Sequence, residues 1–115
     1  MRRGDIVLAD LDPVIGSEAD KRRPIVIVSN NGANRAAELT GRGVIVAVPL
    51  TSNVSTVHLF QVLIPSAESG LRADSKAQVE QIRAVSVQRL TKHLGVLPEH
   101  LMIQIDQAMR RQLDL

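Results

Sequence analysis

The sequence predicts a small, mainly β domain, a barrel or a sandwich, with one helix at its C-terminus. Three observations lead to this prediction. Short apolar runs separated by turn residues recur along most of the chain, two of these runs are β-branched without alternation, and the tail changes to helical spacing. With 115 residues and 44% hydrophobic content, the chain has the size of one domain, which we place at residues 1–115.

The first half of the chain is expected to contribute three strands. One covers residues 5–11 and ends at a turn signal, Asp12-Pro13. Continuous β-branched runs at 25–28 and 44–48 give the next two, with a short helix between them at 31–39. Runs without alternation are typical of strands covered on both faces, so we expect a closed or nearly closed barrel.

The second half is expected to add two strands and the terminal helix. Residues 59–64 form one strand, and residues 76–83, which alternate polar with mostly apolar side chains, form the other. From Pro98 onward, apolar residues recur at helical spacing, which predicts a helix packed on the sheet. The apolar stripe consists of Leu101, Met102, Ile105, Met109 and Leu113.

Composition excludes several classes of function. The chain has no cysteine, which rules out disulfides, thiolate nucleophiles and cysteine-ligated metals. It has one aromatic residue, Phe60, too few for an RNA-binding module that stacks bases on several rings. No apolar run approaches the roughly 18 residues of a membrane span, and no signal peptide is apparent, so a soluble cytoplasmic protein is expected.

No metal or cofactor is expected either. His58, His93 and His100 show no metal-ligand spacing, and the chain has no glycine-rich phosphate motif. Of the three histidines, His58 follows the loop after Thr51 most closely and is the one candidate for a substrate contact.

Two strand ends carry the residues best suited to chemistry. Arg23 closes a long polar loop just before one β-branched run, and Thr51 directly follows the other. If these strands pair antiparallel, a guanidinium and a hydroxyl meet at one edge of the sheet. Such a pair suits RNA cleavage without metal, in which the 2′-hydroxyl attacks the adjacent phosphate and donors stabilise the phosphorane.

Several short motifs, in a fixed order, resemble the MazF/PemK toxins of type II toxin–antitoxin systems. The similarity extends from Arg3 to the C-terminus. The motifs are Arg3-Gly4-Asp5, Asp10-Leu11-Asp12-Pro13, Gly16-Ser17-Glu18, Arg23-Pro24, Val48-Pro49-Leu50-Thr51-Ser52-Asn53, Glu80-Gln81-Ile82-Arg83 and the closing segment 106–115.

This resemblance implies an SH3-like barrel of the MazF/Kid/CcdB kind with a C-terminal helix, assembled as a homodimer. It implies sequence-specific, metal-independent cleavage of single-stranded RNA (mRNA, or rRNA or tRNA), which leaves 2′,3′-cyclic phosphate and 5′-hydroxyl ends and stops translation and growth. It also implies a cognate antitoxin. DNA, which lacks the 2′-hydroxyl, is not expected to be cut.

The resemblance also assigns roles to residues. Arg23 and Thr51 match the catalytic arginine and threonine, and Glu18 matches an acidic residue that acts as a base or orients Arg23. Positions that match or adjoin RNA contacts are Ser17, Arg22, Ser52, Asn53, Ser75 and Gln81. Arg22 competes with Arg23 for the catalytic role, and the Arg-Pro step favours Arg23.

Other interpretations stay open from the sequence alone. In one interpretation the two residues have only structural roles: Arg23 forms an ion pair with Glu18 or Asp20, and the hydroxyl of Thr51 hydrogen-bonds a backbone group at the strand end. At the level of the whole protein, the alternatives are a non-enzymatic, CcdB-like poison that binds another protein and a toxin that binds RNA without cutting it. The pair formed by Arg23 and Thr51 favours the nuclease.

Overall fold

The structure is a computed structural model that describes residues 1–11 and 22–115. Its strands are β1 Asp5–Asp10, β2 Arg22–Ile27, β3 Val44–Thr51, β4 Gln61–Ile64, β5 Ser75–Gln78, β6 Arg83–Ser86 and β7 Leu90–Val96. Its helices are α1 Asn31–Thr40, α2 Ser66–Ser69 and α3 Glu99–Leu113, with short 3-10 helices η1 Val79–Gln81 and η2 Val87–Arg89.

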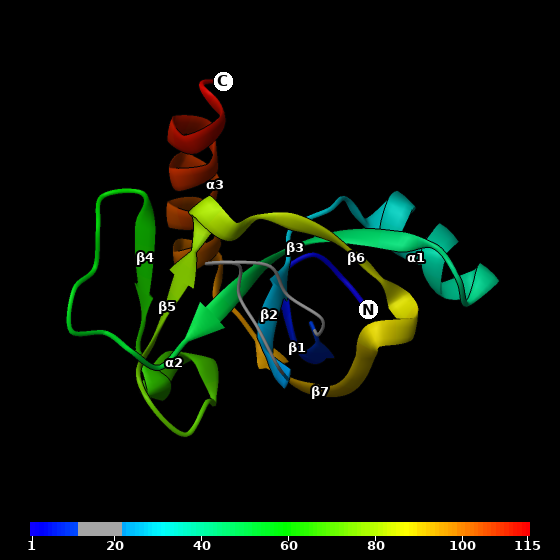
Figure 1. Ribbon diagram of the computed structural model, residues 1–115, viewed down its shortest axis with the longest axis horizontal. Coiled ribbons are helices and arrows are strands. Elements are labelled where there is room, and N and C mark those ends of the chain that lie inside the picture. The colour runs from blue at the N-terminus through cyan, green and yellow to red at the C-terminus, as the bar shows by residue number, and fades with distance from the viewer. Residues whose placement is uncertain (12–21) are drawn as a thin grey trace.

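The strands form one antiparallel sheet in the order β4-β5-β3-β2-β1-β7, and β6 pairs with β3 beside this path. The long strand β3 runs between the two halves of the molecule (Figure 1). Its first half, from Val44 to Ala47, pairs with β6, and its last residues, Leu50 and Thr51, pair with β5. Because β4 and β7 end the path, the described strands form a curved sheet that does not close, so of the expected closed or nearly closed barrel only the closed form is corrected.

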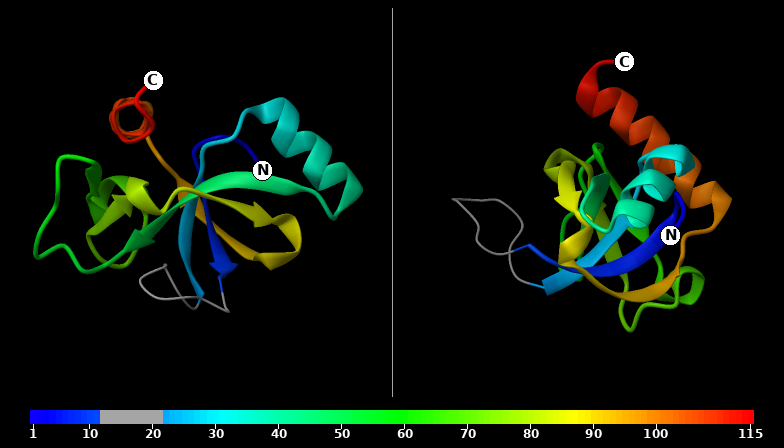
Figure 2. Two further views of the ribbon diagram at one scale, coloured as in Figure 1. Left: turned by 45° about the horizontal axis from the view of Figure 1, so that its top comes forward. Right: turned by 90° about the vertical axis from the view of Figure 1, so that its right-hand side faces the viewer.

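Both faces of the sheet carry a hydrophobic cluster, as the β-branched runs predict. Val26 and Val48 belong to a cluster that also includes residues of α3, whereas Ile25 and Ile27 belong to a second cluster on the other face. The helix α3 lies over the half of the sheet that contains β4, and α1 lies at the opposite end of β3 (Figure 2). The two-sided core explains why these strands show no polar alternation.

The C-terminal helix agrees with its prediction except at its end. Leu101, Met102 and Ile105 are buried, and Ala108 joins them. Leu113, however, is half exposed, because the last turn of α3 extends past the sheet (Figure 2).

The predicted strand at 76–83 is interrupted. The chain leaves β5 after Gln78, makes the 3-10 helix η1, and resumes as β6 at Arg83. By the pairing on either side, the interruption lies opposite Val48 and Pro49 of β3. Pro49 has no N–H to donate to a ladder, so a change of register is tolerated there.

Two elements have weak sequence signals. The strand β7 is largely exposed, so its residues show no hydrophobic pattern, and α2 is only four residues long. The strand expected at 59–64 begins two residues later, at Gln61, because Leu59 is almost fully exposed in the preceding loop.

Candidate active site

The pairing of β2 with β3 brings the two candidate catalytic residues together. The strands are antiparallel, with Ile25 opposite Pro49 and Val26 opposite Val48. Continued by two residues, this register places Arg23 opposite Thr51. Residues directly opposite in antiparallel strands share a face of the sheet, so the guanidinium and the hydroxyl lie on the same side, as the sequence predicts.

The same geometry separates Arg22 from Arg23. Successive side chains of a strand point to opposite faces, so Arg22 starts from the face away from Thr51, although at the strand end it still lines the same pocket. Arg22 is also the more exposed of the two, whereas Arg23 is half buried. The alternation favours Arg23 as the partner of Thr51 and leaves Arg22 suited to a peripheral phosphate contact.

A pocket of about 560 Å³ lies where these strand ends meet the segment before β5. Five residues predicted from the sequence line it, namely Arg22, Arg23, Thr51, Ser52 and Ser75. None of the described residues that line it is acidic, and Arg72 adds a third guanidinium. Three arginines with three hydroxyls favour an anionic ligand, and planar guanidinium groups match phosphate oxygens well.

Arg23 and Thr51 both take part in hydrogen bonds, one between strands and one local. The Nη1 of Arg23 donates to Oε1 of Gln78 over 3.4 Å. The Oγ1 of Thr51 accepts the backbone N–H of Asn53 over 3.3 Å. The structural role considered for Thr51 is therefore real, but accepting this bond uses a lone pair and leaves the hydroxyl proton available for donation.

The other predicted residues are placed differently. Ser17 and Glu18 lie outside the described residues, as does Asp20. Asn53 does not line the pocket; its Oδ1 accepts the backbone N–H and the hydroxyl of Ser55 in a local turn. Gln81 also does not line it and lies in η1.

The histidines lie away from this pocket. His58 stacks on Phe60, with ring centroids 5.1 Å apart and an angle of 12° between the planes. His93 lies on β7 near Asp5, and His100 contacts Glu68 over 2.6 Å. The described residues contain no group of three His, Asp or Glu side chains arranged to hold a metal ion.

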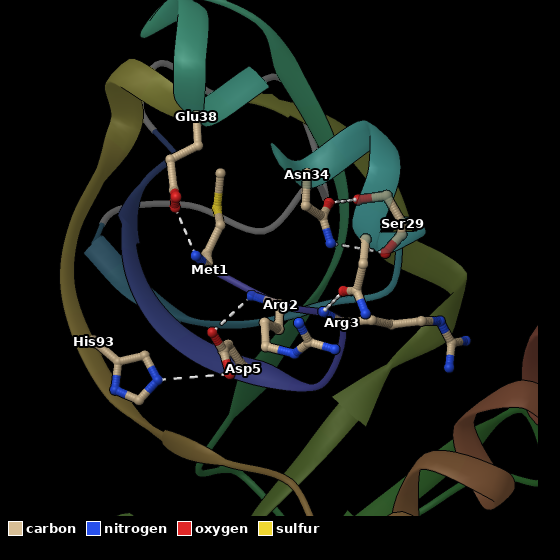
Figure 3. A network of polar contacts seen from close by, with 9 residues as sticks. Met1, Arg2, Arg3, Asp5, Ser29, Asn34, Glu38 and His93 are labelled. Atoms are coloured by element: carbon tan, nitrogen blue, oxygen red, sulfur yellow. Dashed lines mark hydrogen bonds and ion pairs between the residues drawn. The ribbon is translucent and has the colours of Figure 1, made fainter. Parts of the chain in front are cut away.

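A second pocket, of about 460 Å³, lies near the N-terminal segment. Its charged lining residues have mixed signs and include Asp5, Glu38 and Lys92. Neighbouring side chains are joined in a polar network, in which Asp5 accepts the N–H of Arg2 over 2.8 Å (Figure 3). The balance of charge makes this pocket less suited to a polyanion than the first.

Sequence reasoning missed Arg72 and Gln78. Arg72 follows a turn at Gly70, where an isolated exposed arginine is unremarkable. Gln78 is one of two glutamines in the segment 76–83, and only the tertiary structure shows that it reaches Arg23.

Comparison with known proteins decides the family. A sequence profile of the PemK-like, MazF-like toxins of type II toxin–antitoxin systems matches residues 2–113. The chain belongs to this toxin family. It is 49% identical over its full length to endoribonuclease MazF9 of Mycobacterium tuberculosis, and the match covers 98% of that protein. It is 32% identical to endoribonuclease EndoA of Bacillus subtilis, with 100% of this chain and 96% of EndoA covered.

Solved structures of MazF toxins have the same fold. MazF of Deinococcus radiodurans superposes with a TM-score of 0.82 at 21% identity, covering 100% of this chain and 97% of that protein. A mycobacterial endoribonuclease, solved in complex with its cognate antitoxin, gives a TM-score of 0.77 at 26% identity, covering 100% and 96%. The predicted SH3-like fold with a C-terminal helix is confirmed, apart from the open sheet.

The resemblance inferred from the sequence is therefore confirmed, and this MazF-family chain is an endoribonuclease toxin of a type II toxin–antitoxin system. The protein-binding poison is set aside as the main function. None of the helices in the described ranges is long and apolar enough to span a membrane.

Proposed function

We propose that this toxin cleaves single-stranded RNA at specific sequences, without metal, by attack of the 2′-hydroxyl on the adjacent phosphate. The products are a 2′,3′-cyclic phosphate and a 5′-hydroxyl. The observation that supports this mechanism is the β2–β3 register, because it sets Arg23 and Thr51 on one face at the rim of a pocket rich in arginine.

In this proposal Arg23 and Thr51 act on the scissile phosphate. The guanidinium of Arg23 stabilises the extra negative charge of the phosphorane and hydrogen-bonds the leaving 5′-oxygen, which takes a proton from water as the P–O5′ bond breaks and becomes the 5′-hydroxyl. The hydroxyl of Thr51 donates to a non-bridging oxygen and fixes the phosphate in place. Glu18 removes the 2′-hydroxyl proton or orients Arg23, and the two roles predict different pH profiles for a Glu18→Gln variant.

The neighbouring residues bind the rest of the substrate. Arg22, Arg72, Ser52 and Ser75 line the same pocket and suit the phosphates and sugars on either side of the cut. Ser17, Asn53 and Gln81 extend the proposed RNA-binding surface. Because most of these contacts reach the RNA backbone, we place base selectivity in the loops at residues 14–22 and 53–58.

We also infer the assembly and partners of the protein. A cognate antitoxin inhibits it by laying an acidic segment across the arginine-rich pocket, a proposal supported by the related mycobacterial endoribonuclease that was solved with its antitoxin. The chain forms one domain over residues 1–115 and acts as a homodimer. Its substrate, cellular RNA with mRNA foremost, places it in the cytoplasm.

The test is incubation of the purified protein with EDTA and two matched substrates, a long RNA of mixed sequence and a DNA of the same sequence. Primer extension maps the cuts, and the ends are assayed for cyclic phosphate. Discrete RNA cuts with cyclic ends and intact DNA are expected. Cleavage that EDTA abolishes, or 3′-hydroxyl ends, would overturn the mechanism, and wild-type activity in folded Arg23→Ala would overturn the assignment of that residue.

A further inference from the structure

The guanidinium of Arg23 is anchored from two strands away. Arg23 lies on β2, whereas the Oε1 of Gln78, which accepts from its Nη1 over 3.4 Å, lies on β5. The strand β3 separates the two in the sheet order (Figure 1). The side chain of Arg23 therefore extends across β3 to reach its partner.

The register shows where it crosses. Lys76 pairs with Thr51, so Gln78, two residues further along β5, lies on the same face, and Ile25 pairs with Pro49 on the β2 side of β3. Arg23, opposite Thr51, thus reaches diagonally over β3 between Thr51 and Pro49. Alternation places Arg23, Thr51 and Gln78 on one face, so a guanidinium that contacts Gln78 remains beside the Thr51 hydroxyl.

The chemistry of the acceptor suits this task. A glutamine oxygen directs the guanidinium without neutralising it, whereas a carboxylate in the same place would form an ion pair that competes with phosphate. The bond engages one of the five N–H donors of the guanidinium.

We propose that Gln78 is a positioning residue that holds the guanidinium of Arg23 beside Thr51 in the orientation required by the phosphorane. This inference rests on the proposed catalytic role of Arg23. Gln78 itself does not line the pocket, which fits a residue that acts through Arg23 and does not contact RNA.

Gln61, the glutamine that pairs with Gln78 on the neighbouring strand, has a structural role and makes different hydrogen bonds. Gln61 of β4 pairs with Gln78 across the sheet, but its side chain accepts the backbone N–H of His58 and donates to Glu80 over 2.8 Å. Gln61 therefore secures the loop before β4. Replacing Gln61 is expected to alter loop stability, and replacing Gln78 is expected to alter catalysis.

The experiment compares kcat and KM for Gln78→Leu and Gln78→Asn with the control Gln104→Leu, an exposed glutamine of α3. Asparagine keeps the amide but is one methylene too short to reach, and it serves if the leucine variant does not fold. Both are expected to lower kcat about tenfold with KM unchanged within twofold, because small misplacement of a catalytic group is costly. Gln78→Glu retains an acceptor and is expected to preserve kcat while raising KM.

A second arm uses Arg23→Lys, whose ammonium does not span the same distance as a guanidinium fork. In that background, adding Gln78→Leu is expected to have no further effect on kcat. Wild-type kcat in folded Gln78→Leu and Gln78→Asn, or full additivity with Arg23→Lys, would overturn the role of Gln78. Activity retained by Arg23→Ala would instead overturn the proposed function on which it rests, so the two failures are distinguishable.

Discussion

Lys76 of β5 lies directly opposite Thr51 of β3, and its ammonium donates to the backbone carbonyl of Thr56 over 2.5 Å. The lysine is buried, with 9% of its surface exposed. It therefore ties the loop that follows β3 to β5, the strand that pairs with the end of β3 at the proposed catalytic hydroxyl. The residue before it, Ser75, lines the proposed active site.

Removing this link is expected to destabilise the loop at residues 52–60 more than the strand β3. Lys76→Met keeps the length of the side chain and removes the charged donor, which is expected to lower the free energy of unfolding by about 1–2 kcal/mol. Urea unfolding measures the loss, and amide exchange should show it concentrated in residues 52–60. Exchange that rises equally across β2 and β3 would contradict a local role.

The contribution of Thr51 to RNA cleavage is expected to depend on its hydroxyl group and not on the shape of its side chain. Thr51→Val is nearly isosteric and removes the donor, so cleavage is expected to fall by about 10²–10³-fold, whereas Thr51→Ser keeps the hydroxyl and most of the activity. Single-turnover cleavage of one RNA site measures both. A valine variant as active as the serine variant would show that the hydroxyl only caps the strand end.

Arg72 is expected to bind phosphate without taking part in chemistry. Arg72→Gln should raise KM and leave kcat unchanged, and the slope of log affinity against log salt should fall by about 0.7, the value of one phosphate contact on single-stranded nucleic acid. Arg42→Gln, an exposed arginine outside the pocket, is the matched control. An unchanged salt slope for Arg72→Gln would exclude a phosphate contact there.

Gly95 is expected to be required for packing between β7 and α2. A Cβ at this position would lie 2.6 Å from the carbonyl oxygen of Ser69, and a backbone atom cannot move aside as a flexible side chain does. Gly95→Ala is expected to destabilise the fold by about 1–3 kcal/mol. Gly32→Ala in α1, where the nearest atom is a side-chain oxygen at 3.3 Å, is the control and should change the melting temperature little.

Much of this structure was readable from local patterns. The β-branched runs predicted β2 and β3 as strands covered on both faces, and the apolar stripe predicted α3, because burial selects these side chains directly. The exposed strand β7 and the interruption at η1 were not predicted, since an exposed strand has no apolar alternation and a change of register depends on the partner strand.

The sequence by itself determined the toxin family, the strand ends at which Arg23 and Thr51 stand, and the prediction that the two meet. Their meeting required a partner and a register, which hydrogen bonding between β2 and β3 decides. Only the tertiary structure showed that the sheet remains open, that Arg72 joins the pocket and that Gln78 reaches Arg23 across β3. Contacts between residues far apart in the chain depend on the order of strands, and no local pattern of side chains encodes that order.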